Sequence, residues 1–228
     1  MKRGEIKSGR LMRCFCLSLF LLLSAYACQA QDVVDKMVAT VNGGVRTDLI
    51  TYSDLLWQIA LQPNTPIDNP SSDALNRTLQ LIINQRLIYQ EAEKLPTINP
   101  TDKEISDELA ALIKLFPSQT DFMERVRRVG LTSEQLREII RQRVAIDKYL
   151  DFRFRSFTVV TPKEVSDYYR DVYVPRFQRQ YPGRIVPVFE QVSKQLEAQL
   201  TEDKIKSETT SFLDTARERA EITILNPV

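Results

Sequence analysis

The chain has 228 residues, with 31 Lys and Arg against 30 Asp and Glu, no histidine and three cysteines. Histidine is the usual general base near neutral pH and the commonest transition-metal ligand, so serine triads, Cys/His pairs and zinc sites lose an essential part. All three cysteines lie within the first 30 residues, which excludes a disulfide scaffold for the remainder. No phosphate-cradling glycine motif occurs. We therefore predict no catalytic residue, no metal site and no cofactor.

Residues 1–30 have the three parts of a secretory signal peptide. Basic side chains come first, an apolar run extends from Cys14 to Leu23, and small residues end the segment. The run is shorter than the ~20 apolar residues that a transmembrane helix needs. We predict export to the periplasm with cleavage after Ala30. The alternatives are cleavage after Ala27 and a retained membrane anchor.

Cys28 adds one more alternative for this end of the chain, a lipoprotein anchored through that cysteine. The lipoprotein pattern has leucine three residues before the cysteine and a small residue two before it, whereas this sequence has Ala25 and Tyr26. Contact with a membrane is therefore expected only if Cys28 is lipidated. Beyond residue 30 the chain has 26 basic and 29 acidic side chains, a net charge of −3, so no nucleic-acid partner is expected.

The first folded segment is predicted to be a β-hairpin at residues 37–47. Asn42-Gly43 supplies the positive φ values of a tight turn, and β-branched residues flank it. Apolar residues then recur at three- and four-residue spacing, the pattern of amphipathic helices. Helices are predicted at residues 51–61, 73–95, 101–116, 120–130, 133–157, from 161 onward, and at 188–220.

Several helix ends are marked by their own residues. Thr101 with Glu104, and Thr161 with Glu164, are capping boxes in which hydroxyl and carboxylate satisfy free backbone N–H groups reciprocally. Gly130 is expected to end a helix in a Schellman motif. The helix that follows is predicted to be capped by the serine at position 133.

Residues 222–225 alternate in polarity like a strand. A strand near each end of an otherwise helical chain predicts that the N-terminal hairpin pairs with the C-terminal strand. The predicted fold class is therefore mainly α with a small sheet. The domain prediction is a signal peptide at 1–30, an N-terminal helical domain at 31–173, a proline-rich connection at 174–187, and a helix and strand at 188–228 that complete the N-terminal domain.

Aromatic and arginine side chains crowd residues 152–181. Both are enriched where proteins bind other proteins, although core packing is the alternative at every single position. The candidate peptide-binding residues are Trp57, Phe116, Phe122, Tyr149, Phe152, Tyr168 and Tyr173.

Several segments together resemble the SurA-type periplasmic chaperones and their parvulin-linked relatives: residues 34–45, 82–92, 100–108, 129–137 and 212–225. That family normally inserts parvulin prolyl-isomerase domains before the closing helix, where this chain has only a short interval. The resemblance therefore implies the chaperone core alone, without isomerase activity. In the family this core binds extended, aromatic-rich segments of outer-membrane proteins without ATP.

Three interpretations follow. We favour an ATP-independent holdase in the periplasm that binds unfolded outer-membrane or envelope proteins through an aromatic and apolar groove. The alternative is a structural or adaptor subunit that binds one folded envelope partner through the same surface. A peptidyl-prolyl isomerase is the weakest of the three, because no segment has the length of a catalytic domain.

Overall fold

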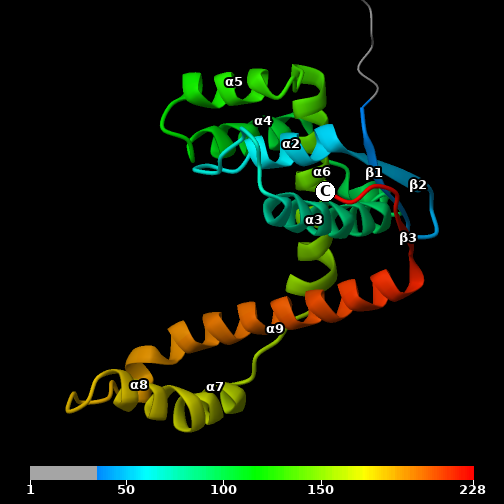
Figure 1. Cartoon of the computed structure of the whole chain (residues 1–228). Helices are drawn as coiled ribbons and strands as arrows, with labels where there is room; N and C mark the ends of the chain where they lie inside the picture. The colour runs from blue at the N-terminus through cyan, green and yellow to red at the C-terminus, as the bar shows by residue number, and fades with distance from the viewer. Residues whose placement is uncertain (1–34) are drawn as a thin grey trace, which may run out of the picture. The chain divides into compact units, whose positions relative to one another are not determined.

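The computed structural model describes residues 35–228, so the predicted signal peptide and Cys28 lie outside the described residues. The fold is mainly helical with one small antiparallel sheet, as predicted (Figure 1). Within residues 35–228, no helix has both the length and the apolar character needed to cross a bilayer. In chain order the elements are β1 (Met37–Asn42), β2 (Thr47–Thr51), α2 (Tyr52–Ala60), α3 (Ser72–Ala92), η2 (Pro96–Ile98), α4 (Asp102–Ile113), α5 (Gln119–Arg128), α6 (Ser133–Leu150), η3 (Asp151–Arg155), α7 (Pro162–Tyr168), η4 (Tyr169–Tyr173), α8 (Val174–Gln180), α9 (Phe189–Arg219) and β3 (Glu221–Ile224).

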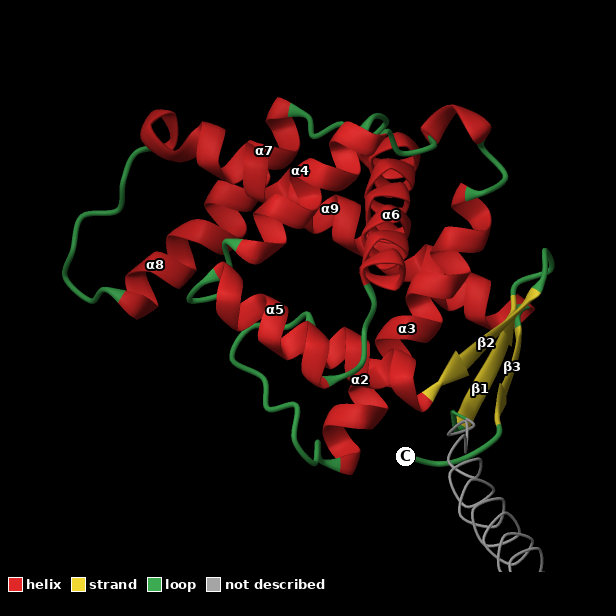
Figure 2. Cartoon of the chain, turned by 90° about the horizontal axis from the view of Figure 1, so that it is seen from above, coloured by secondary structure: helices red, strands yellow, loops and turns green. Residues whose placement is uncertain are grey.

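The sheet confirms that the two ends of the described chain pair with each other. Its strand order is β2-β1-β3, and β1 is antiparallel to both neighbours (Figure 2). Ala39 lies opposite Ile224 across the β1–β3 ladder. The hairpin turn differs from the prediction, because Asn42 still pairs with Thr47 and the positive φ of 91° falls on Gly44. The loop is therefore longer than a two-residue primed turn.

Helices α2 and α3 pack against the sheet and bury its apolar side chains. The apolar stripe on α3 that includes Leu79, Ile83 and Leu87 forms this core with Val38 and Ile50 of the hairpin. Burial of these branched and aliphatic side chains, each contributing roughly 1.5–3 kcal/mol, fixes the hairpin to the helices.

A second core joins α4, α5 and α6. The capping box of α4 and the glycine end of α5 are as predicted, whereas α4 ends at Ile113 and not at residue 116. Gly130 has φ 68°, and the N–H of Leu131 donates to the carbonyl of Val126 at 3.1 Å, which is the Schellman pattern. The start of α6 also differs, because its N-cap is Thr132 and not the serine after it. Thr132 forms a capping box with Gln135, so a side chain one residue earlier supplies the acceptor.

The segment after Leu150 is where the structure departs most from the prediction. The helix continues past α6 only as η3, a π-helical turn. The proline-rich connection predicted at 174–187 includes a helix, α8, in its first half. Pro175 lies in the first turn of α8, where a missing N–H group is tolerated. Irregular chain starts only at Tyr181.

Candidate functional site

Helix α9 packs against two separate parts of the molecule. Near its start, Val192 and Leu196 are buried against Val165 of α7. Further along, α9 packs against α3 and η3 (Figure 1). A surface hollow lies beside each of these contacts, and both hollows are lined in part by α9 side chains. We call the hollow beside the α7 contact the α7 groove, and the hollow beside the contact with α3 and η3 the α9 groove.

The α7 groove has a volume of about 450 Å³ and lies between α7, η4 and α9. Its apolar lining comes from Val160, Tyr168, Val172 and Leu200, and its charged rim from Glu164, Asp167, Asp171, Asp203 and Lys204. An apolar floor with a polar rim is the usual anatomy of a site that takes up apolar side chains from a polar chain.

An ion pair between Glu164 of α7 and Lys204 of α9 connects the two helices that form this groove. The ammonium group of Lys204 donates to Glu164 Oε1 at 3.1 Å and to the carbonyl of Val159 at 3.0 Å. The other carboxylate oxygen of Glu164 accepts from the backbone N–H of Thr161 at 2.7 Å in the predicted capping box. The capping N–H and the Lys204 ammonium lower the pKa of Glu164 to about 2.

This pKa predicts an acid-sensitive contact between α7 and α9. A carboxylate with a depressed pKa in the fold stabilises it fully above its unfolded pKa, here 4.5, and that stabilisation is lost as the pH falls towards 2. We expect the protection factors of the α7 amides, which compare each exchange rate with the intrinsic rate at the same pH, to fall on acidification over this window. In Glu164→Gln these protection factors should already be lower at neutral pH and should depend less on pH.

Glu197→Gln is the matched control, because Glu197 is exposed on α9 and its carboxylate forms no ion pair with any residue in 35–228. Hydrogen-exchange mass spectrometry from pH 7 to pH 3 makes the comparison. A Glu164→Gln profile identical to that of the Glu197→Gln protein at every pH would contradict the role of this contact.

The α9 groove has a volume of about 510 Å³ and lies between α3, η3 and the second half of α9. Phe212 of α9 reaches into the aromatic residues there, with its ring centroid 6.0 Å from that of Tyr149 and 5.8 Å from that of Phe154. The Arg153 guanidinium lies 5.1 Å from the centre of the Phe212 ring, within the range of a cation–π contact. The groove is thus apolar at its base and charged at its edge.

Two exposed phenylalanines lie in the stretch of sequence from η3, which borders the α9 groove, to α7, which borders the α7 groove. The rings of Phe152 and Phe157 meet edge to face with centroids 6.4 Å apart, and the residues are 50% and 72% exposed. Val159, two residues on, is 69% exposed. Phe152 and Phe154 are two residues apart and therefore lie on opposite sides of the helical turn, so Phe154 is buried at the α9 groove while Phe152 remains outside. This cluster of exposed apolar side chains is unusual for a protein surface.

The structure separates the seven candidate residues predicted from the sequence. Phe116 and Phe122 are buried together in the second core, where Trp57 packs against them and its indole N–H donates to the carbonyl of Val129 at 3.1 Å. Tyr149 is also buried, at the base of the α9 groove. Phe116, Phe122 and Tyr149 therefore pack in the interior of the molecule, and Tyr149 also lines the α9 groove.

The remaining three candidates lie in the region of the grooves. Phe152 is exposed, Tyr168 lines the α7 groove, and Tyr173 stacks on Tyr169 with ring centroids 5.7 Å apart. Sequence reasoning missed several side chains of this surface, namely Phe157, Val159, Val160, Val172, Leu200 and Phe212. Aliphatic residues within helices look the same in sequence whether they enter a core or line a groove.

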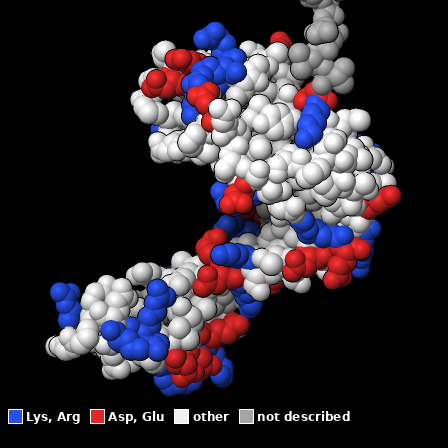
Figure 3. Space-filling view, viewed as in Figure 1, with Lys and Arg blue, Asp and Glu red and all other residues white. Residues whose placement is uncertain are grey.

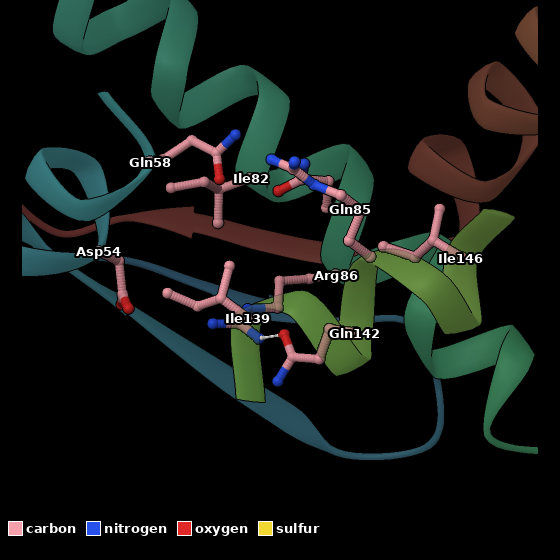
Figure 4. A pocket seen from close by; sticks show the side chains of 9 residues that line it. Asp54, Gln58, Ile82, Gln85, Arg86, Ile139, Gln142 and Ile146 are labelled. Atoms are coloured by element: carbon pink, nitrogen blue, oxygen red, sulfur yellow. Dashed lines mark hydrogen bonds between the residues drawn. The ribbon is translucent and has the colours of Figure 1, made fainter. Parts of the chain in front are cut away.

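A third hollow lies between α2, α3 and α6 and has a volume of only about 40 Å³ (Figure 4). Polar groups surround it, and Arg86 Nη1 donates to Gln142 Oε1 at 2.6 Å. Arg86 Nε is buried without a hydrogen-bond partner among the described residues. A hollow of this size is too small for an apolar side chain of another protein.

No protein-family model matches the chain. Over 158 residues the chain is 28% identical to the chaperone SurA of Hydrogenovibrio crunogenus, an alignment that covers 66% of this chain and 34% of that protein. The chain therefore matches about one third of the length of that relative. This similarity supports a relationship to SurA-like chaperones, in agreement with the resemblance of the individual segments.

Proposed function

We propose that this protein is an ATP-independent periplasmic chaperone that holds unfolded outer-membrane or envelope proteins along α9. The observation that carries the proposal is the exposed pair Phe152 and Phe157 next to two grooves with apolar floors. The similarity to chaperone SurA of another organism supports the same class of function. Tyr168 and Tyr173 remain candidates for client contact or for support of the α7 groove.

The spacing of the grooves fits an extended polypeptide. A further, shallow hollow on α9 shares Asp203 with the α7 groove and Ser211 with the α9 groove, so it connects the two grooves along α9. From Leu200 to Arg219, α9 rises about 29 Å at 1.5 Å per residue. A client strand at roughly 3.3 Å per residue would cover that length with about nine residues.

The chemistry along this path suits reversible holding. Burial of one exposed Phe side chain against a client contributes roughly 1.5–3 kcal/mol. The entropy lost on ordering an unfolded client offsets much of that gain. Between the grooves, α9 presents short polar side chains at Ser207, Thr210 and Ser211, which are suited to hydrogen bonds with a client backbone. Weak contacts of this kind release a client without ATP.

The test is aggregation of a urea-denatured outer-membrane β-barrel protein after dilution, followed by light scattering without ATP. We expect the wild-type protein to suppress scattering at near-stoichiometric ratios. Phe152→Ala with Phe157→Ala should need at least tenfold more protein for the same suppression, because two apolar contacts of about 1.5 kcal/mol each are lost. The matched control is Leu81→Ala with Leu115→Ala, two exposed apolar residues that line neither groove.

Two results would contradict the proposal. One is a wild-type protein that suppresses no aggregation beside a working chaperone. The other is an equal loss of suppression in the phenylalanine pair and the leucine pair. Capture of a single folded envelope protein, with denatured proteins ignored, would support the adaptor alternative instead.

A further inference from the structure

Helix α8 and the loop that follows it, residues 174–188, form a segment with unusual charge, which we call the tip. It contains Arg176, Arg179 and Arg184 and no acidic residue. All three arginines are exposed, and none forms an ion pair with a residue in the described range 35–228. Arg170, in contrast, is paired with Asp167 and Asp171. Figure 3 shows basic side chains among uncharged atoms at the α8 end.

Apolar side chains project from the same segment. Ile185 is 93% exposed, the largest exposed fraction among the large apolar residues, Val188 is 53% exposed and Tyr181 is 40% exposed. Leaving such groups in water has no benefit for stability, since burying them would be favourable. The tip thus combines unpaired positive charge with unburied aliphatic side chains.

Hydrogen bonds and ring contacts hold the tip in a defined conformation. The Tyr169 hydroxyl donates to the carbonyl of Pro187 at 2.8 Å, and the N–H of Tyr181 donates to the carbonyl of Phe177 at 2.8 Å. The rings of Tyr169, Tyr173, Phe177 and Tyr181 contact one another in series, with centroid separations of 5.7, 5.9 and 5.0 Å. These four residues are spaced four apart along η4 and α8.

The π-helical turn explains how this row of rings remains on one face. On an α-helix of 3.6 residues per turn, residues four apart rotate by about 40° per step. A π-helical turn bonds i to i+5 and holds more residues, so it rotates residues four apart in the opposite sense. The π-helical turn η4 therefore compensates for the α-helical drift of α8, and the row leads from the buried Val165 cluster to the tip.

We infer that the tip docks on an anionic lipid surface. Arginine guanidinium groups bind phosphate oxygens with bidentate geometry, and aliphatic side chains enter the boundary between headgroups and acyl chains. A tyrosine ring suits the interface between them. Because residues 31–228 carry a net charge of −3, overall attraction to such a surface is absent and the binding is local to the tip. This inference is independent of the proposed function.

The test is co-sedimentation with vesicles of phosphatidylcholine, with and without phosphatidylglycerol. The protein is the full chain recovered after export, in the N-terminal form that the host produces. Arg176→Ala with Arg179→Ala should lower the partition coefficient on anionic vesicles about 25-fold, since one basic residue near such a surface contributes about fivefold. Ile185→Ser should lower it roughly tenfold. Added salt should weaken the arginine contribution and leave that of Ile185.

The matched control is Arg77→Ala with Arg127→Ala. Both arginines are exposed and form no ion pair with a residue in 35–228, so this pair changes the net charge equally. Partition of the control pair should stay within twofold of wild type. An equal loss in the tip pair and the control pair would overturn the inference. So would tip variants that bind vesicles normally but no longer suppress client aggregation, because the tip would then be a client-binding surface.

The test of the tip is separated from the test of the proposed function by measuring how well the same tip variants suppress aggregation of a denatured client when no lipid is present. Tip variants that lose vesicle binding and retain aggregation suppression support the inference. Their result stands even if the wild-type protein suppresses no aggregation at all.

Discussion

Replacing Gln90 with leucine is expected to lower the free energy of unfolding by about 3–5 kcal/mol. Gln90 is fully buried on α3 beneath the hairpin. Its Oε1 accepts from the N–H of Gly43 at 2.8 Å, and its Nε2 donates to Asp48 Oδ2 at 2.8 Å and to the carbonyl of Arg46 at 3.2 Å. Leucine fills the space but leaves these hairpin groups without their partner, and the cost is the desolvation of each.

Glycine at position 43 is part of the same arrangement. A Cβ atom there would lie 2.8 Å from Gln90 Oε1 and 3.3 Å from Leu87 Cδ2, so a larger residue would displace the carboxamide. Urea unfolding followed by circular dichroism measures the effect of Gln90→Leu. Gln191→Leu, at an exposed glutamine on α9, should change stability by less than about 0.5 kcal/mol. A Gln90→Leu protein as stable as the Gln191→Leu protein would show that these hydrogen bonds contribute nothing net.

The second large effect is expected at Arg125, which supplies hydrogen-bond donors to the C-terminal end of α2. Its guanidinium donates to the carbonyls of Ala60 at 3.2 Å, Gln62 at 3.2 Å and Thr65 at 2.7 Å. Carbonyls at a helix end have no partner within the helix, so an outside donor is needed. Burial lowers the pKa of Arg125, as expected for a cation partly removed from water.

Arg125→Met retains the aliphatic stem and removes every donor. We expect a loss of about 2–4 kcal/mol in the free energy of unfolding and faster amide exchange around residues 61–66. Arg127→Met is the matched control on the same helix, because Arg127 is exposed and forms no ion pair within residues 35–228. Similar unfolding midpoints for the two variants would count against Arg125 as the stabilising contact.

Features encoded by neighbouring residues could be predicted from the sequence. The capping pair Thr161 and Glu164 forms as expected, and Gly130 has the left-handed conformation that ends α5. Each depends on side chains within a few positions of the backbone groups that they satisfy. Gln90 and Arg125 gave no such signal, because their partners lie more than forty residues away in the chain. Polar side chains of this kind are identified only when the tertiary structure brings the partners together.

The sequence indicated the region of the candidate site, but only some of the individual residues predicted for it lie at its surface. Phe122 and Phe157 are both aromatic residues near arginines, yet one is fully buried and the other is 72% exposed. The difference comes from how α5 packs on its neighbours and how η3 ends, which involves contacts between distant segments. Phe152 and Phe154 lie on opposite sides of a helix because they are two residues apart, but which of them is buried depends on how α9 packs against η3.

The pairing of β3 with β1 also determines when during synthesis the sheet can be completed. Ala39 finds its partner Ile224 only after the chain has been synthesised through β3, so the sheet stays incomplete while the intervening helices are made. Until then, β1 has one unpaired edge, and the core beneath it lacks Ile222 and Ala220. Contacts between such distant residues close slowly. A nascent chain of this kind stays incompletely folded until β3 has been synthesised and has paired with β1.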